Sequence, residues 1–435
     1  MISIFHGLLR AGRSRLGLES SCIALGHGAT ILAGLVSVRL YTELVPRDVF
    51  GGANLLIGIM VLFTQGLVAP VTQTQVRYQA DYTGRGLGQY YASLILRYAL
   101  LASAVAAAPV LIACLLWPEL RAGAGLAVVP LLFAWIVATS IKSVVVGRLN
   151  AERRQMEYSR FIGAEALSIL VVTAIALSLS ATIEAFIAGQ FAGTVLALVL
   201  FGAGSRELLN LSRDEHDIAR DVQQQIWRYG LPFAPIILLE WFANQTDRYV
   251  LASHVELSAV GIYAAAFAIA SKPSMIAGGA LTDLLRPVLF STYAEARASA
   301  ENYYRIWLVL QVICSVFVVF IFFSFGDLIA EILLADTYRD GAPQLMVWIS
   351  AAYGIRALAM VLENRFYAIE QPQCIAMIKG IAVIVGVSAA LLLIPTVGLV
   401  GAAMANFATQ LIYIVACAIV LRFSFAGAKN GSTSA

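Results

Sequence analysis

Residues 380–421 read GIAVIVGVSAALLLIPTVGLVGAAMANFATQLIYIVACAIVL and contain no charged side chain. A transmembrane helix needs about 20 consecutive apolar residues to cross a hydrocarbon core of roughly 30 Å. The stretch is long enough for two such helices, and Pro395 and Gly398 near its middle are typical of the turn between them. It therefore predicts a helical hairpin inside a membrane.

The whole chain shares this composition. Of its 435 residues, 60% are hydrophobic and only 13% are charged, whereas a soluble domain usually has about 25% charged residues. The mean hydropathy is +0.82, and the apolar residues come in long blocks such as 306–325, which carries no charge. The composition predicts an all-α integral membrane protein, because a water-soluble core cannot hide this much apolar surface.

Twelve apolar blocks are expected to span the bilayer, in two sets of six. The first set is 20–41, 50–72, 98–117, 124–146, 161–180 and 184–203. The second set is 229–252, 259–286, 306–326, 342–363, 375–395 and 398–421.

A polar stretch between the two sets contains RELLNLSRDEHDIARDVQQQIWR, residues 206–228. Ile218, Val222 and Ile226 recur every four residues, which predicts an amphipathic helix on the cytoplasmic membrane surface. The chain is therefore expected to consist of a six-helix lobe at 1–204, a linker at 205–228, a second six-helix lobe at 229–426 and a disordered tail at 427–435.

The positions of the basic residues predict the orientation. Cytoplasmic loops of membrane proteins are rich in Lys and Arg. With both termini cytoplasmic, nineteen of the 29 Lys and Arg residues fall in inside segments, and only Arg47, Arg121 and Arg339 fall in outside loops. The seven that remain lie within the spans: Arg39, Lys142, Arg248, Lys272, Arg286, Arg356 and Lys379.

The two lobes carry similar landmarks. The first has Arg39, Gly51 and Arg77, at spacings of 12 and 26, and the second has Arg248, Gly261 and Arg286, at spacings of 13 and 25. A second similarity is between RLNAE, which begins at Arg148, and RFYAIE, which begins at Arg365. Both lobes begin on the cytoplasmic side, so these similarities predict a parallel repeat, as in many transporters. Chance is the alternative, because arginines are common at helix ends.

The segment NQTDRYVLASHVELSAVGIYAAAFAIASKP, Asn244 to Pro273, resembles the seventh and eighth spans of bacterial polysaccharide-biosynthesis flippases. These proteins belong to the multidrug/oligosaccharidyl-lipid/polysaccharide exporter superfamily. The pair Asp247–Arg248, followed by Val-Gly-Ile-Tyr from Val260, is the most specific part. Arg39 with the Gly51-Gly52 turn, and VGLVGAA from Val397, are also similar to this family.

This resemblance implies a two-lobed transporter that works by alternating access in the bacterial cytoplasmic (inner) membrane. The implied substrate is an undecaprenyl-pyrophosphate-linked oligosaccharide, moved from the cytoplasmic to the periplasmic leaflet. Membrane lipid and the polysaccharide polymerase and export machinery are the expected partners. The basic residues are scattered between apolar blocks, so no nucleic acid is expected, and no motif predicts a cofactor or a metal.

Charged side chains inside a membrane face partners, water or substrate, because exposure to hydrocarbon is unfavourable by at least about 2.5–3.5 kcal/mol. Arginine and lysine recognise phosphate well. The candidates for a pyrophosphate cradle are Arg39, Arg248, Lys272 and Arg356. Arg248 could instead pair with a carboxylate elsewhere in the helix bundle.

The acidic residues within the spans could be structural partners of the bases or titrating groups for ion coupling. They are Glu165, Glu240, Asp247, Asp283 and Glu363. Asp247 and Asp283 are expected to be structural ion-pair partners, with ion coupling as the alternative. For Glu240 the two roles stay equally open. Lys142, Arg286 and Lys379 lie near the inner ends of their spans and are expected to extend to the membrane interface.

Two other functions fit the same architecture. A drug/cation antiporter of the same superfamily would favour acidic over basic cavity residues, whereas here seven bases meet five acids within the spans. An integral-membrane polysaccharide polymerase or ligase would need a sizeable periplasmic loop, and the longest expected outside loop is short. The chain has no HExxH or GxSxG motif, so no enzymatic activity is expected.

The orientation can be tested with reporter fusions. Fusions after Gly204 and Lys429 should report the cytoplasm, and fusions near Glu256 and Asp336 should report the periplasm, because the basic loops remain inside. A C-terminus found in the periplasm would contradict both the twelve-span topology and the parallel repeat.

Overall fold

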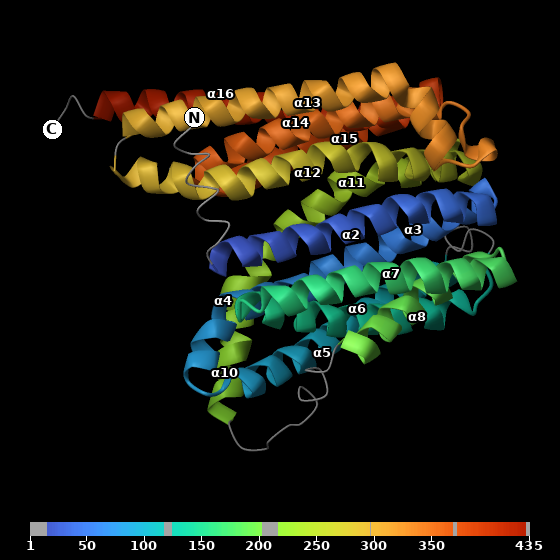
Figure 1. Ribbon diagram of the computed structural model, residues 1–435, viewed down its shortest axis with the longest axis horizontal. Coiled ribbons are helices and arrows are strands. Elements are labelled where there is room, and N and C mark those ends of the chain that lie inside the picture. The colour runs from blue at the N-terminus through green and yellow to red at the C-terminus, as the bar shows by residue number, and fades with distance from the viewer. Residues whose placement is uncertain (1–14, 117–123, 202–215, 296, 369–371, 432–435) are drawn as a thin grey trace. The chain divides into compact units, whose positions relative to one another are not determined.

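A computed structural model describes residues 15–116, 124–201, 216–295, 297–368 and 372–431 of the chain (Figure 1). All regular secondary structure in these ranges is helical. The chain divides into two compact units, Met1–Leu238 and Leu239–Ala435. The all-α membrane architecture expected from the composition is therefore confirmed.

Unit 1 contains eight α-helices and three shorter helical segments among its described residues. They are α2 (Arg15–Leu44), α3 (Arg47–Phe63), η1 (Thr64–Val68), α4 (Ala69–Gly84), α5 (Gly88–Leu116), α6 (Val128–Ala151), α7 (Gln155–Leu179), α8 (Ile183–Phe201), α10 (His216–Gln225), η3 (Ile226–Gly230) and η4 (Leu231–Phe233).

Among its described residues, unit 2 has six long helices and one short turn. They are α11 (Ala234–His254), whose first turn belongs to unit 1, α12 (Leu257–Glu295), α13 (Arg297–Leu333), η5 (Asp336–Tyr338), α14 (Ala342–Ala368), α15 (Pro372–Val397) and α16 (Leu399–Gly431).

Within the described part of the chain, ten helical segments are long and apolar enough to cross a membrane. The other two expected spans correspond to α2 and α11. Helix α11 is less apolar because it carries three charged residues, Glu240, Asp247 and Arg248. Charges inside a transmembrane helix mark functional or structurally paired positions, so α11 is the first place to look for a site.

The hairpin at residues 380–421 forms as predicted. Helix α15 ends at Val397 and α16 begins at Leu399, so Gly398 is the whole connection. Its φ of +70° lies in the left-handed region that favours glycine. A Cβ atom on Gly401 would lie 2.4 Å from the carbonyl oxygen of Leu393. Both glycines therefore allow α16 to turn back closely against α15.

The second span of unit 1 contains a π-helical segment. Helices α3 and α4 are joined without a break through η1, Thr64–Val68, which is one π-helical turn. Pro70 follows directly, at the start of α4. Proline has no backbone N–H and cannot donate to a carbonyl in the preceding turn, which accounts for the interrupted α-helical ladder. Such π-segments occur frequently at functional sites.

The amphipathic linker differs from the prediction in its partner. Of the expected linker 205–228, residues 205–215 lie outside the described residues, and helix α10 begins at His216. Val222 is fully buried in an apolar cluster with Tyr91 and Leu94, and Ile218 packs against the same cluster. The four-residue spacing correctly predicted an apolar face, but this face packs on the helices of unit 1 instead of on a membrane surface.

The end of the chain also differs from the prediction. Helix α16 continues to Gly431, into the stretch 427–435 that was expected to be disordered. Residues 432–435 lie outside the described residues.

Helices α7 and α8 approach each other through glycines. A Cβ atom on Gly189 would lie 2.5 Å from the Thr173 Cα atom, and one on Gly193 would lie 2.6 Å from the Ile169 Cα atom. The two glycines are four residues apart, so they form one small-residue face that allows close backbone packing between membrane helices.

Alanine at Gly189 or Gly193 should destabilise unit 1 by about 1–3 kcal/mol, because the new methyl group meets backbone that cannot move aside. Thermal unfolding of the purified, detergent-solubilised variants measures this effect. Gly279→Ala is the matched control, since nothing lies within 4 Å of its new Cβ atom. Equal midpoints for all three variants would show that the α7–α8 contact does not need glycine.

Candidate functional site

Four charged side chains from three helices meet inside unit 2. The Arg356 guanidinium on α14 lies 3.1 Å from Glu363 Oε1 and 3.5 Å from Glu240 Oε1 of α11. The Lys379 Nζ atom on α15 lies 2.6 Å from Glu240 Oε2 and 3.8 Å from Glu363 Oε1. Each base therefore contacts both acids, and the four form one ion cluster, called the charge cluster below.

Tyrosine 413 on α16 completes the charge cluster. Its hydroxyl donates to Glu363 Oε1 at 2.5 Å, and its ring lies 5.7 Å from the Arg356 Cζ atom and 5.8 Å from the Lys379 Nζ atom. The aromatic ring thus faces both cations, a favourable geometry for cation–π attraction. Four helices, α11, α14, α15 and α16, contribute to the cluster.

The helical repeat explains how the charge cluster is built. Arg356 and Glu363 are seven residues apart on α14, which places them two turns apart on one face. The side chains of Arg356, Lys379 and Glu363 are 12–14% exposed, whereas that of Glu240 is 40% exposed. A cavity of about 20 Å³ borders Glu240, Arg356, Lys379 and Tyr413. Glu240 is therefore the most accessible member of the cluster.

The charges of the cluster cancel, with two bases against two acids. Removal of one acid, by protonation or by rotation away, would leave a base without its partner in a mostly buried site. An anionic group could then take the place of the carboxylate, because guanidinium and ammonium groups bind phosphate and carboxylate oxygens alike. Chemically, the cluster can exchange anions.

Two helical turns further along α11, a second polar group surrounds Asp247. Its Oδ2 atom accepts a hydrogen bond from the Tyr263 hydroxyl, and its Oδ1 atom accepts one of 2.8 Å from the backbone N–H of Arg248. The guanidinium of Arg248 contacts Gln245 and lies over the Phe267 ring, with its Cζ atom 4.5 Å from the centroid. Asp247 and Arg248 are buried, at 6% and 7% exposure.

Tyr353 connects the two groups. Its hydroxyl donates to Asn244 Oδ1 at 2.8 Å, and its ring makes an edge contact with Phe267 at 5.2 Å between centroids. Glu240, Asn244 and Asp247 follow the α-helical spacing on α11. A continuous polar strip therefore runs along one face of this helix, from the charge cluster to Asp247.

The other candidates from the sequence lie apart from these groups. Arg39 forms an ion pair with Glu43, one turn later on α2. Lys272 is half-buried on α12 and Asp283 is exposed on the same helix. Neither makes an ion pair or a side-chain hydrogen bond within the described part of the chain. The structure thus joins Arg356 with Glu240, and Asp247 with Arg248.

Sequence reasoning missed two members of the charge cluster. Lys379 was expected to extend to the inner interface but pairs with Glu240 and Glu363 instead. Glu363 was counted among the membrane acids without a role. The seven-residue spacing of Arg356 and Glu363 was a readable signal, whereas the partner of Lys379 depends on how α15 packs.

Two more basic residues expected at the interface have partners within their own units. Lys142 lies 3.0 Å from Glu165, and Arg286 donates to Asn364 at 2.7 Å. These contacts join α6 to α7 and α12 to α14. Both side chains therefore contribute to helix packing.

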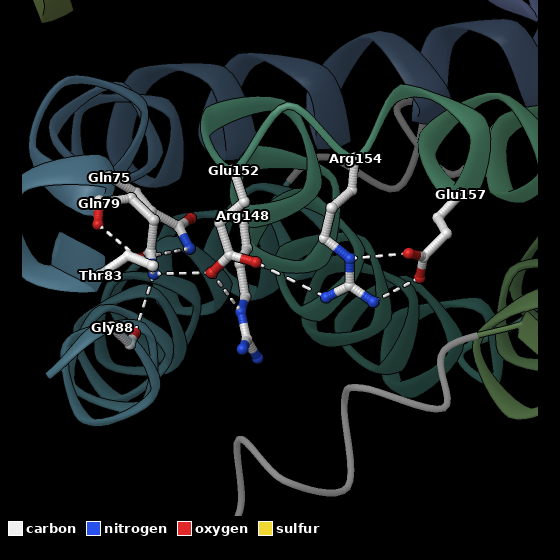
Figure 2. A network of polar contacts seen from close by, with 8 residues as sticks. All are labelled: Gln75, Gln79, Thr83, Gly88, Arg148, Glu152, Arg154 and Glu157. Carbon is white, nitrogen blue, oxygen red and sulfur yellow. Dashed lines mark hydrogen bonds and ion pairs between the residues drawn. The ribbon is translucent and has the colours of Figure 1, made fainter. Parts of the chain in front are cut away.

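The RLNAE motif forms a polar junction in unit 1 (Figure 2). Arg148 lies 2.9 Å from Glu152 Oε1, and the Gln79 side chain donates to this same oxygen and to the carbonyl of Gly88 at 3.2 and 2.8 Å. Arg154 reaches the other Glu152 oxygen at 3.6 Å. The junction ties α4, α5 and α6 together at the start of α7.

The related motif in unit 2 makes a different contact. Arg365 pairs with Glu301 of α13 at 2.7 Å and lies over the ring of Tyr304, and Glu370 lies outside the described residues. The two motifs share their place at the end of a helix but not their ion pair. No group of three or more His, Cys, Asp or Glu residues that could hold a metal ion occurs in the described ranges.

Known structures share this fold. An inward-facing multidrug resistance MATE family transporter of the MOP superfamily aligns with a TM-score of 0.71 at 15% identity, covering 93% of this chain and 96% of its own. The lipid II flippase MurJ aligns with a TM-score of 0.67 at 11% identity, covering 92% and 87%. A MOP superfamily transporter from Pyrococcus furiosus aligns with a TM-score of 0.59 at 14% identity, covering 94% and 95%.

The sequence itself also matches a known family. No curated protein matches the chain, but the family model described as polysaccharide biosynthesis protein matches residues 18–293. This match includes the polar strip of α11 up to Asp247. Together with the shared fold and the ten apolar helical segments of the described ranges, it identifies a multi-pass integral membrane protein. The chain belongs to the polysaccharide biosynthesis protein family and has the fold of the MOP superfamily transporters.

Proposed function

We propose that this transporter flips an undecaprenyl-pyrophosphate-linked oligosaccharide from the cytoplasmic to the periplasmic leaflet of the bacterial inner membrane. The observation that carries the proposal is the charge cluster, in which Arg356 and Lys379 lie side by side within a membrane-spanning bundle. A pyrophosphate group is anionic and cannot cross hydrocarbon without compensation. Two adjacent bases within the bundle supply that compensation.

In the proposed mechanism, the pyrophosphate displaces a carboxylate from the bases. Glu240 is the carboxylate to be displaced, because its side chain is 40% exposed while that of Glu363 is 12% exposed. Arg356 then offers its planar fork to phosphate oxygens and Lys379 offers a point charge. Proton uptake by the released Glu240 would couple substrate binding to an ion gradient.

The remaining candidates take different parts in this proposal. Lys272 is half-buried and has no ion-pair partner among the described residues, so it is available to a substrate without prior exchange. Arg248 positions α11, since its guanidinium already contacts Gln245 and Phe267. Asp247 also positions α11, because it accepts hydrogen bonds from the Tyr263 hydroxyl and from the backbone N–H of Arg248. Arg39 contributes after release from Glu43, and Asp283 remains a candidate for ion coupling.

Lys379→Ala and Arg356→Ala should each reduce polysaccharide export about 10- to 100-fold, because each removes a charge-assisted contact to phosphate worth roughly 1.5–3 kcal/mol. Export is measured as surface polysaccharide in a strain that depends on this transporter, and protein abundance is measured in parallel. Arg305→Ala is the control, a base of unit 2 that is 73% exposed.

A double variant separates substrate binding from ion pairing. Lys379→Met combined with Glu240→Gln removes both partners, so no unpaired charge is left in the bundle. If the pair is only structural, this double variant should regain both abundance and export. If Lys379 binds substrate, abundance should return while export stays low. Normal export by the double variant would contradict the proposed role of the charge cluster.

Transport should also respond to membrane potential alone. Outward movement of negative charge across an inside-negative membrane is favoured by about 2.3 kcal/mol per charge per 100 mV. Reconstituted vesicles with a potassium–valinomycin potential and equal pH on both sides test this directly. Electrogenic transport would be contradicted by a flipping rate that does not change with the potential but rises with a proton gradient. A loss of that gradient dependence in Glu240→Gln would then assign the coupling to Glu240.

A further inference from the structure

Unit 1 contains a cavity that the charge cluster does not explain. Its volume is about 260 Å³, many times the roughly 30 Å³ that one water molecule occupies. It lies between the η1–α4 segment and α6, with Tyr158 of α7 at one end. Fourteen residues from these elements line it.

Two helical faces form the walls of this cavity. The first runs from Gln65 through Thr72 to Val76, and the second runs from Thr139 through Ser143 to Asn150. Each wall extends over twelve residues, and the eleven steps between the first and the last residue give a length of about 16 Å at 1.5 Å per residue. The cavity is therefore an elongated slot between two helices, long enough for an oligosaccharide.

The lining of the slot is polar and uncharged. Nine of its fourteen lining residues carry a hydroxyl or an amide, and none carries a formal charge. This composition differs from the charge cluster of unit 2, which consists of ionised groups around a much smaller space. A site for phosphate or for a metal ion would need charged partners. Sugar hydroxyls both donate and accept hydrogen bonds, and neutral hydroxyl and amide side chains can do both in return.

The polar groups of the slot present both donors and acceptors. The hydroxyls of Thr64 and Ser143 donate to backbone carbonyls of their own helices, each at 2.8 Å. Their oxygens therefore face the slot as acceptors. The side chains of Gln65 and Gln73 are exposed and make no hydrogen bond within the described residues. Their amides supply both donors and acceptors, as recognition of a polyhydroxylated ligand requires.

Backbone geometry independently marks the same place. The π-helical segment η1 contributes Thr64, Gln65 and Val68 to the wall, and π-segments occur frequently at functional sites. On the opposite wall, a Cβ atom on Gly147 would lie 2.8 Å from Gln75 Oε1. The glycine thus keeps α4 and α6 close beside the slot without filling it.

We propose that this slot binds the glycan of the transported lipid, through hydroxyl and acetamido groups of uncharged sugars. The inference rests on the proposed function and extends it, because it assigns sugar recognition to unit 1 and phosphate recognition to the charge cluster of unit 2. It also assigns Gln65 and Gln73 as the residues that contact the sugars.

Photocrosslinking in cells that make the polysaccharide tests the proposal. p-Benzoylphenylalanine replaces Gln73 in the slot or, as the control, Phe133, which lies on α6, is 43% exposed and does not line the slot. After irradiation, mild acid cleaves the bond between sugar and pyrophosphate. Mass spectrometry of the modified peptide then shows whether the retained adduct is glycan or polyprenyl lipid.

Glycan mass retained at position 73 and absent at position 133 is the expected result, and it should disappear in cells that lack the first glycosyltransferase. Lipid mass at position 73, or no adduct there, would overturn the glycan assignment. In that case, polysaccharide export by the cells that make the glycan would leave the flippase proposal intact. Failure of the wild-type chain to support export would overturn both.

A second variant pair gives an independent readout. Gln65→Leu with Gln73→Leu should lower flipping of the complete lipid-linked oligosaccharide about tenfold, but should leave flipping of the same lipid bearing only its first sugar unchanged. The truncated lipid retains the pyrophosphate and offers few hydroxyls to the slot. An equal loss for both lipids would indicate a general defect of unit 1 and contradict the assignment.

Discussion

The hydrocarbon core of a membrane offers no hydrogen-bond partner, and the rest of this structure depends on that constraint. Every backbone group must find its partner within its own segment, so spanning segments become helices. Every charged side chain must find a partner within its bundle or face water. The interior bases follow this rule, since Lys142 pairs with Glu165 and Lys379 pairs with Glu240.

The same constraint makes the charge cluster both stable and exchangeable. Two bases and two acids compensate one another, so no unpaired charge remains in the described state. Breaking a buried pair from one side is strongly unfavourable, by about 3–5 kcal/mol. An incoming anion that replaces one carboxylate avoids that penalty. In the proposed mechanism, electrostatics thereby links substrate binding to the release of Glu240.

The two units provide different chemistries. Unit 2 concentrates ionised groups around a space of about 20 Å³, whereas unit 1 has an uncharged polar slot of about 260 Å³. A lipid-linked oligosaccharide also has two chemistries, a compact anionic group and a larger neutral glycan. In our proposal, the charge and the volume of the polar space in each unit correspond to one of these two parts of the substrate.

The sequence by itself determined the membrane class, the helical spans and the positions of the intramembrane charges, because apolar block length and charge are local properties. It also predicted the turn at Gly398 and the apolar face of Ile218 and Val222. Only the tertiary structure decided which partner each charge and each face meets. Lys379 and Glu240 are 139 positions apart, and no local pattern reports which helices pack side by side. The polar slot could not be predicted for the same reason. Its walls come from two helices, and neither helix alone shows that its hydroxyls and amides line a cavity.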